Sequence, residues 1–255
     1  MERSNAWEKY SKADLEKVFT FAEDYRKFIS MCKTERECVK RSVEIAEEAG
    51  YKNLEDIIRK GRKLKAGDRV YAVNMGKAVV LFNIGKEPIE DGMNILGAHI
   101  DSPRLDLKQN PMYEDSDLVL LDTHYYGGIK KYQWVTVPLA LHGVVALKDG
   151  SVVDVSIGED ENDAVVGISD LLIHLSQEQL EKKGNKVVEG EDLNILVGSM
   201  PATDAALEFG NVTADNDDVD EDDKKHKVKK YILALLKDKL SLIHISEPTR
   251  QAEIS

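Results

Sequence analysis

The chain has 255 residues, of which 42% are hydrophobic and 32% charged, a balance typical of a globular protein. Its formal net charge of −12 argues against nucleic acid as a partner, because binding to phosphates needs a basic surface. No apolar run approaches the roughly 18 residues that cross a membrane, and the first residues lack the apolar centre of a signal peptide. These features predict a cytoplasmic protein that binds neither nucleic acid nor membranes.

The first part of the chain has the pattern of two long helices. Apolar residues recur at steps of three and four, which predicts the buried stripe of a helix: Leu15, Val18, Phe19, Ala22 and Tyr25. Residues 34–37 (Thr-Glu-Arg-Glu) have the pattern of a capping box for a second helix, for which Gly50 is the stop signal. A shorter segment follows at residues 54–64.

The hydrophobic period then changes to two. Residues 69–75 and 77–84 predict paired strands around Gly76. Residues 94–98 are apolar apart from Asn94, which predicts a third strand buried on both faces. Helices followed by apolar strands favour an α/β layer.

From about Gln109 onward the chain predicts a mostly-β region. We expect strands at residues 118–121, 134–141, 144–147, 152–157 and 193–197, with Asp149-Gly150 as a hairpin turn. Residues 169–183 predict a helix with Ser169 as N-cap and Gly184 as stop. The acidic run at residues 215–223 has the composition of a solvated, mobile loop that leads into a helix.

The last residues resemble a translated sequencing adapter. Residues 240–250 (Leu-Ser-Leu-Ile-His-Ile-Ser-Glu-Pro-Thr-Arg) match the transposase adapter of DNA sequencing libraries, and such segments are excluded from fold reasoning. We therefore expect the natural sequence to be interrupted near Lys239. The expected organisation is one domain at residues 1–108, a second at 109–239, and a non-native tail at 240–255.

Two cysteines and several histidines are candidate functional residues. Cys32 and Cys38 are too few for a disulfide scaffold, and their spacing places them on different sides of a helix, so we interpret both as ordinary thiols. His124 and His142 lie in strand-like segments as core or surface residues, and His226 lies in a charged, solvated run.

His99 differs from the other histidines because it ends an apolar run and is followed by Asp101 and a Ser-Pro break. Open α/β sheets bind ligands at the carboxyl ends of their strands. Neutral imidazole is a common zinc ligand, and an Asp two residues later can hold the other ring nitrogen. His-x-Asp is a short motif, so a purely structural role for His99 stays open on pattern alone.

Three blocks in order resemble the M18 metallo-aminopeptidases, the aspartyl-aminopeptidase family. Residues 97–103 (Gly-Ala-His-Ile-Asp-Ser-Pro) resemble the first metal motif of that family. Residues 125–134 (Tyr-Tyr-Gly-Gly-Ile-Lys-Lys-Tyr-Gln-Trp), continuing through 138–143, resemble the segment that opens the family's inserted β domain. Residues 171–175 (Leu-Leu-Ile-His-Leu) resemble its apolar-His-Leu segment. The resemblance extends over most of residues 10–239.

The chain is most similar to the bacterial branch of the family, M18 aminopeptidase 1. Residues 134–138 (Trp-Val-Thr-Val-Pro) stand where the eukaryotic aspartyl type has Trp-Phe-Asp-Arg-Asp. This departure argues against a preference for acidic N-terminal residues. The resemblance implies an α/β fold in which residues 1–108 are the N-terminal half of a zinc-aminopeptidase α/β sandwich and residues 109–239 an inserted, β-rich dimerisation domain.

The resemblance also implies a pair of zinc ions about 3.5–4 Å apart that activate a bridging water, with cobalt or manganese as other suitable metals. His99 would ligate one zinc, and Asp101 would orient that imidazole, in preference to direct ligation by Asp101. His174 matches a histidine that reaches into a neighbouring subunit's active site and stabilises the scissile carbonyl oxygen. Local packing on a helix face is the other interpretation of His174.

The family's remaining ligands are not found in the sequence. A bridging carboxylate, a Glu-Glu pair with the general base, another acidic ligand and a second histidine all follow the inserted domain in the family. Glu47-Glu48 lies in an early helix and is a poor candidate for the pair. Zinc normally needs about three or four protein ligands, so one histidine will not hold it tightly.

The sequence therefore leaves three hypotheses. The first is the N-terminal fragment of a zinc-dependent aminopeptidase that removes N-terminal residues from peptides, inactive by itself and a homo-oligomer in its full-length parent. The second is a non-catalytic module that binds peptides or supports assembly. The third, an unrelated α/β protein, leaves the second and third blocks unexplained.

Overall fold

The computed structural model describes residues 4–147, 149–210 and 226–239. The chain divides into two compact units, Met1–Ser102 and Pro103–Ser255. Strand β4 (Arg104–Asp115) opens the second unit and includes residue 108, the last residue of the first domain expected from the sequence. The acidic run at 215–223 and the adapter-like tail at 240–255 lie outside the described residues.

Two capped helices open the first unit. A short 3₁₀ helix, η1 (Ala6–Lys9), precedes α1 (Lys12–Met31), whose N-terminus is closed by a capping box between Ser11 and Asp14. Helix α2 (Glu35–Glu48) begins with the predicted capping box of Thr34 and Glu37. The backbone then turns at Gly50, whose φ of 86° is a conformation that favours glycine.

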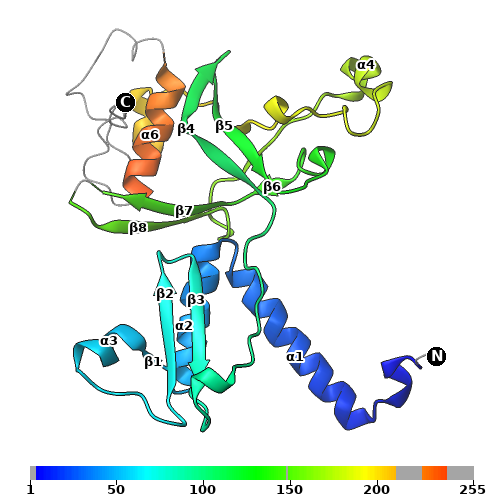
Figure 1. Cartoon of the computed structure of the whole chain (residues 1–255). Coiled ribbons are helices and arrows are strands. Elements are labelled where there is room, and N and C mark those ends of the chain that lie inside the picture. Colours follow the sequence, from blue (N-terminus) through cyan, green and yellow to red (C-terminus); the bar gives the residue numbers. More distant parts are fainter. Residues whose placement is uncertain (1–3, 148, 211–225, 240–255) are drawn as a thin grey trace. The chain divides into compact units, whose positions relative to one another are not determined.

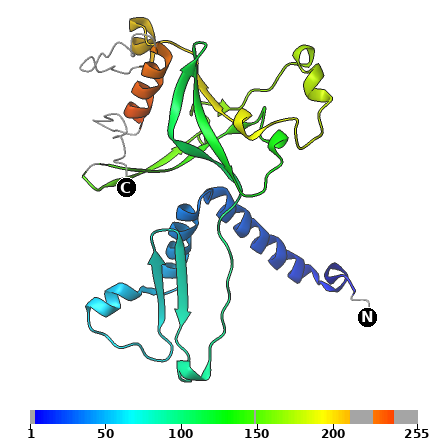
Figure 2. The ribbon, with the colours of Figure 1, turned by 45° about the horizontal axis from the view of Figure 1, so that its top comes forward.

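The apolar stripe predicted for α1 is present on a helix, but it is not buried. No residue of α1 is buried, and Phe19 and Tyr25 are among the exposed large side chains of the chain. Figures 1 and 2 show α1 running away from the sheet of its own unit. Over most of its length, therefore, no described element of this unit covers the apolar side of α1.

A three-stranded sheet forms the centre of the first unit. Its order is β1 (Lys52–Asn53), β2 (Arg69–Asn74) and β3 (Ala78–Asn83), with β1 parallel and β3 antiparallel to β2. The predicted hairpin around Gly76 is confirmed, and Met75 and Gly76 both have positive φ at its turn. Helix α2 packs against β2 and β3, while α3 (Leu54–Arg59) contacts β1 and β2.

The strand predicted at residues 94–98 is not formed. After the 3₁₀ helix η2 (Ile89–Asp91), residues 92–103 have no regular secondary structure. Figure 1 shows this connection beside β3 without a strand arrow. A strand needs a hydrogen-bonded neighbour, and no described strand pairs with this segment. The prediction of burial on both faces was wrong for the same reason.

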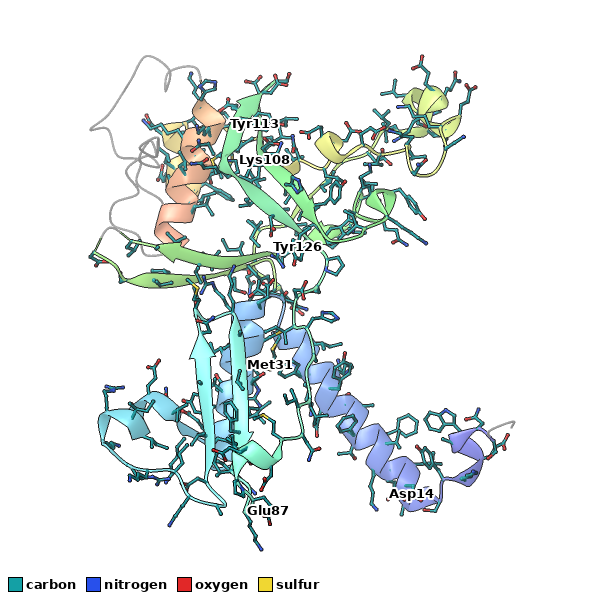
Figure 3. All side chains as sticks on the ribbon, in the orientation of Figure 1. Asp14, Met31, Glu87, Lys108, Tyr113 and Tyr126 are labelled. Atoms are coloured by element: carbon teal, nitrogen blue, oxygen red, sulfur yellow. The ribbon has the colours of Figure 1, made fainter. Side chains whose placement is uncertain are left out.

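The second unit is built on a five-stranded sheet, which confirms its mostly-β character. The strand order is β4, β5 (Leu118–Tyr126), β10 (Ile195–Gly198), β9 (Val166–Gly167) and β6 (Pro138–Leu139), and every pairing in it is antiparallel. Figure 3 labels Lys108 and Tyr113 on β4 and Tyr126 at the end of β5. The turn between β4 and β5 has positive φ at Ser116 and Asp117, as hairpin turns of type I′ require.

A separate hairpin joins β7 (Leu141–Ala146) to β8 (Val152–Ile157) through the predicted Asp149-Gly150 turn. The strand predicted at residues 134–141 is largely absent. The 3₁₀ helix η3 (Lys131–Gln133) precedes it, and Thr136 has a φ of 60°, which interrupts an extended run. Only the two residues of β6 and the first residue of β7 form strand within that range.

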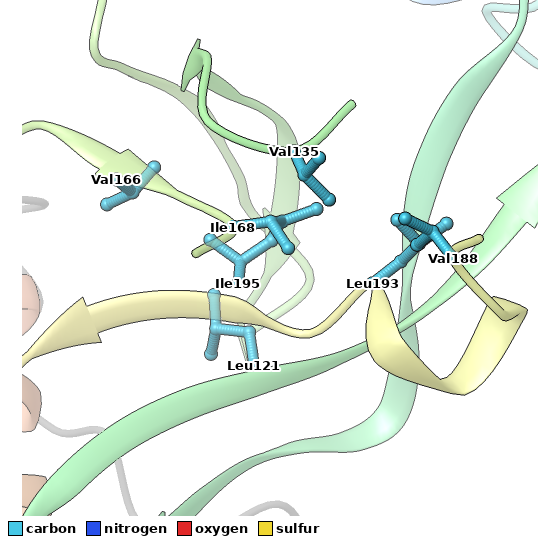
Figure 4. Packing of buried hydrophobic residues seen from close by; sticks show 7 residues of the cluster. All are labelled: Leu121, Val135, Val166, Ile168, Val188, Leu193 and Ile195. Carbon is cyan, nitrogen blue, oxygen red and sulfur yellow. The ribbon is translucent and has the colours of Figure 1, made fainter. Parts of the chain in front are cut away.

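The core of the second unit lies between its sheet and the connections that cross it (Figure 4). Full burial of one such aliphatic side chain stabilises a fold by about 1.5–3 kcal/mol. Helices α5 (Asp204–Gly210) and α6 (Lys227–Lys239) form a second cluster, and α6 packs against β4, β5 and β10. The buried members of the main cluster are Leu121, Val135, Val166, Ile168, Val188, Leu193 and Ile195.

The helix predicted at residues 169–183 is replaced by short turns. The structure has η4 (Ile173–Leu175), α4 (Gln177–Leu180) and, further on, η5 (Gly190–Asp192). Leu172 has an extended backbone and Ser169 does not cap a helix. Most helical stability comes from packing of an apolar face, and here the apolar side chains are exposed: Leu171, Leu172, Leu175 and Leu180.

Candidate functional site

The structure brings His99 and Asp101 together at the end of the irregular segment of the first unit. The His99 Nδ1 atom lies 3.0 Å from the Asp101 backbone oxygen and 3.2 Å from the Asp101 Oδ1 atom. The His99 side chain is 84% exposed and that of Asp101 is 40% exposed. The pair is therefore an open, solvent-facing arrangement in which one ring nitrogen is already engaged.

The partners of Nδ1 determine which ring nitrogen of His99 can bind a metal. Both Asp101 atoms near Nδ1 are hydrogen-bond acceptors, so Nδ1 must carry the proton and donate it. In the neutral imidazole the lone pair is then on Nε2. A metal-ligating histidine usually donates its other N–H to a carboxylate or a carbonyl, and His99 has both acceptors available.

Helix α2 holds the peptide that joins His99 to Asp101. The Cys38 Sγ atom donates a hydrogen bond to the Ile100 backbone oxygen, at a distance of 3.8 Å. Cys38 is buried in α2, and Ile100 is half-buried between the two candidate residues. Ile100 thus contacts α2 through its backbone oxygen, between the exposed His99 and the half-buried Asp101.

These residues are too few to hold a zinc ion by themselves. In the part of the chain that the structure describes, no group of three or more His, Cys, Asp or Glu side chains is arranged to bind a metal. Zinc sites in proteins normally use about three or four protein ligands. His99 and Asp101 therefore fit one corner of such a site and not a complete one.

His174 lies in the second unit, on η4, and its side chain is exposed. It lines an open cavity of about 690 Å³ formed by the connection between β9 and β10. Figure 1 shows the neighbouring helix α4 at the end of an arm that projects from the sheet of its unit. The charged side chains around the cavity, besides His174, are Asp170, Glu178, Lys182 and Asp192.

The other described histidines have local partners, as expected for core or surface residues. The His124 ring stacks on Tyr125, and its Nδ1 atom lies 2.8 Å from the Tyr125 backbone oxygen. The His142 Nε2 atom lies 3.0 Å from the Glu159 Oε1 atom. His226, which was predicted to be solvated, is half-buried.

The early Glu-Glu pair is also engaged in structural contacts. The Tyr71 hydroxyl donates to the Glu47 Oε1 atom at 2.6 Å, and this hydrogen bond raises the pKa of Tyr71. Glu48 lies 4.0 Å from the Arg41 guanidinium. Both carboxylates therefore serve contacts around α2, consistent with their rejection as catalytic residues.

The two cysteines are not on one helix, and this corrects the sequence interpretation. Cys32 is the C-cap residue of α1, whereas Cys38 lies in the first turns of α2. Burial, with the neighbouring Cys38 thiol, raises the pKa of Cys32 to about 11. The capping box at Thr34 could have revealed this, because an N-cap between two residues separates them onto different helices.

Comparison with known proteins decides the family. A family model described as aminopeptidase I zinc metalloprotease (M18) matches residues 28–250. The chain belongs to the M18 aminopeptidase family. The resemblance inferred from the three sequence blocks is confirmed, and the hypothesis of an unrelated α/β protein is excluded.

M18 relatives of known sequence and structure match nearly the whole chain. The probable M18 family aminopeptidase 1 of Clostridium acetobutylicum is 56% identical over 241 residues, which are 94% of this chain and 48% of that protein. A crystal structure of aminopeptidase I from the same species has a TM-score of 0.74 and covers 94% of this chain and 49% of that one. The chain spans about half the length of these M18 relatives.

Two further structures extend the comparison. The M18 aminopeptidase of Thermotoga maritima is 37% identical, with a TM-score of 0.78 over 94% of this chain and 47% of that one. The S. cerevisiae mApe1 dodecamer is 19% identical, with a TM-score of 0.53 over 73% of this chain and 39% of that one. The predicted α/β fold is confirmed, and the distant match supports the fold alone.

No helix among the described residues has the length and apolar character needed to cross a bilayer.

Proposed function

We propose that this chain is the N-terminal part of a zinc-dependent aminopeptidase that removes N-terminal residues from peptides. The observation that carries the proposal is the state of the His99 imidazole. Its Nδ1 atom is held by Asp101, and the lone pair on Nε2 is left for a metal. This arrangement occurs in a chain that belongs to a zinc metalloprotease family.

His99 would hold one zinc ion of a co-catalytic pair, and Asp101 would keep the imidazole in the ligating tautomer. Bound zinc would supply an activated water and a Lewis acid, a role that cobalt or manganese could also fill. The remaining ligands and the general base would come from outside the described residues, since only a partial donor set is present among them. The full-length relatives contain as much sequence again.

The second unit would serve assembly and substrate binding. We propose that it is an inserted dimerisation domain and that His174 reaches a neighbouring subunit's active site, where it stabilises the scissile carbonyl oxygen. Exposure supports this role, because His174 and the leucines around it are uncovered on a projecting arm. One structure that shares the fold, mApe1, is a dodecamer, and by analogy with it we propose a homo-oligomeric parent.

For the isolated chain, a second function has specific support. The incomplete donor set around His99 favours a module that binds peptides or supports assembly without catalysis. The two proposals differ in one measurable property. Both predict that residues 1–239 hydrolyse no aminoacyl anilide with added zinc or manganese, and only the first predicts that a full-length protein containing them does so. Metal-dependent turnover by residues 1–239 would refute the argument that the site is incomplete.

The roles of His99 and Asp101 can be tested in the full-length protein. His99→Ala should abolish hydrolysis of aminoacyl anilides because a ligand is lost. Asp101→Asn should weaken metal affinity by about 10–100-fold, as changes in the partners of ligating histidines do. His124→Ala is the matched control, since His124 is also an exposed histidine but has only local contacts. Full activity in His99→Ala would remove His99 from the ligands.

A further inference from the structure

Residues 92–102 combine an irregular backbone with an exposed surface. Within this segment Ile95 is 79% exposed and Leu96 is fully exposed, so neither side chain holds the backbone in place. The His99 side chain is exposed as well, and Asp101 is half-buried. A contact that fixes the backbone near His99 must therefore come from an element outside the segment.

Cys38 makes such a contact from a rigid position. It is 8% exposed and lies in the first turns of α2, next to Val39, which is also buried. The start of α2 is fixed by its capping box, in which the Glu37 carboxylate accepts hydrogen bonds from the backbone N–H groups of Lys33 and Thr34. Helix α2 also packs on the sheet. Cys38 thus connects the segment that carries His99 and Asp101 to helix α2 and the sheet on which α2 packs.

The hydrogen bond requires a protonated thiol, and the surroundings provide one. Burial raises the pKa of the Cys38 thiol, so at neutral pH it carries the proton that it donates to the Ile100 oxygen. The Cys32 thiol is a neighbour of Cys38, and its Sγ atom donates to the Glu37 backbone oxygen at 3.7 Å. The two thiols are therefore packed in place as donors and are poorly suited to act as nucleophiles.

The backbone oxygen that accepts the Cys38 hydrogen bond belongs to the peptide group directly before Asp101. The Ile100 oxygen belongs to the planar peptide group that ends at the Asp101 N and Cα atoms. A hydrogen bond that holds this oxygen therefore also fixes the orientation of the bond from the Asp101 N atom to its Cα atom. Asp101 in turn receives the Nδ1–H of His99 through its backbone and carboxylate oxygens. The orientation of the His99 ring, and hence of the Nε2 lone pair, follows from this peptide plane.

We propose that Cys38 is a positioning residue for the His99–Asp101 motif, holding through the Ile100 carbonyl the peptide that orients the His99 imidazole. Its importance for metal binding rests on the proposed function, but its effect on the backbone does not. A thiol that acts in this way touches neither metal nor substrate. A serine at position 38 keeps a hydrogen-bond donor there, whereas an alanine has none.

Backbone dynamics of this chain test the anchoring step directly. NMR order parameters should be higher at Ile100 and Asp101 than at Ile95 and Leu96 of the same segment. Cys38→Ala should remove that difference and bring Ile100 toward the flexible range below about 0.6. Cys38→Ser should retain part of the difference, because the hydroxyl still donates but on a shorter Cβ–O bond. The proposal is overturned if Ile100 stays as ordered in Cys38→Ala as in the unmodified chain.

A matched control distinguishes loss of the contact with Ile100 from a general loss of stability of helix α2. Val39→Ala removes a buried side chain from the same turn of α2 without touching the donor to Ile100. It should lower the melting temperature and leave the order parameters of Ile100 and Asp101 unchanged. If Val39→Ala loosens Ile100 as much as Cys38→Ala does, the effect belongs to α2 as a whole and the proposal fails.

Zinc titration of the full-length protein distinguishes this proposal from the proposed function. Cys38→Ala should weaken zinc binding by about 10–100-fold, and Cys38→Ser should restore part of it. Weak binding in Cys38→Ser with an ordered Ile100 would identify the thiol as a ligand and overturn the positioning role. Loss of the order difference in Cys38→Ala would support the anchor even if the unmodified full-length protein bound no zinc, an outcome that would reject the proposed function alone.

Discussion

The tripeptide Asn-Ile-Leu occurs twice in this chain and has opposite surroundings in the two units. At residues 94–96 it lies in an irregular segment with Ile95 79% exposed. At residues 194–196 it lies at the start of β10 with Ile195 3% exposed. Both stretches were predicted to be strands, and burial on both faces was predicted for the first. The difference shows that an apolar pattern indicates only a preference for strand, and that pairing with neighbouring strands determines whether the segment becomes a buried strand.

The neighbours of the second copy are specific. Ile195 and Leu196 are paired with Leu121 and Leu120 of β5, and Leu196 also with Gly167 of β9. The Asn194 side chain accepts from the Thr123 backbone N–H at 3.2 Å and donates to the Tyr113 hydroxyl at 2.9 Å. The first copy has no paired strand among the described residues. Strand pairing and side-chain hydrogen bonds together account for the difference in burial.

A pair of matched truncations should sharpen this comparison most strongly. Ile195→Ala removes a buried core side chain and should lower the free energy of unfolding by about 2–5 kcal/mol. Ile95→Ala removes the same atoms from an exposed position and should change it by less than about 0.5 kcal/mol. Urea unfolding monitored separately for each unit measures both. Equal effects would show that the two copies are equally buried in solution.

Loss of the buried Thr123 hydroxyl, which lies beside residues 194–196, should give the next largest change in the free energy of unfolding. Thr123 is 2% exposed and its Oγ1 atom donates to the Leu193 backbone oxygen at 2.6 Å. Thr123→Val should cost about 1–3 kcal/mol, because the buried carbonyl loses its partner. Thr20→Val is the control, since its hydroxyl also donates to a carbonyl but on the exposed surface of α1. If both variants unfold at the same urea concentration as the unmodified chain, the Thr123 bond is not formed.

The smallest expected effect on stability comes from the Cys32 thiol of the first unit and appears only at high pH. The folded pKa of Cys32, about 11, lies above its ordinary value of 9.0. Its contribution to stability is therefore complete below pH 9 and is lost as the pH rises through 11. At pH 8 the folded thiol should have about 100-fold less thiolate than in the unfolded chain and react correspondingly slowly with iodoacetamide. Equal alkylation rates in buffer and in urea would contradict the raised pKa.

Features with local signals were predicted correctly from the sequence. The capping box at Thr34 and the hairpins around Gly76 and Gly150 depend on residues only a few positions apart. The contact of His99 with Asp101 is likewise local, since it joins residues two positions apart. Such contacts follow from short-range geometry, so a single sequence is enough to predict them.

Features that depend on distant neighbours were predicted poorly. The contact of Cys38 with Ile100 spans 62 positions, and no periodicity in the sequence points to it. The exposure of the α1 stripe and the loss of the helix at residues 169–183 depend on which surfaces lie opposite, which pattern alone does not specify. The interruption near Thr136 follows from an unusual backbone angle at a residue type that rarely adopts it.

The zinc content of a full-length protein that contains this sequence tests the central claim most directly. We expect about two zinc ions per subunit in the unmodified protein, as in two-metal hydrolases, and fewer than two in His99→Ala. Elemental analysis by mass spectrometry after exhaustive dialysis gives the number. The same zinc content in His99→Ala and in the unmodified protein would show that the His99 imidazole is not a metal ligand.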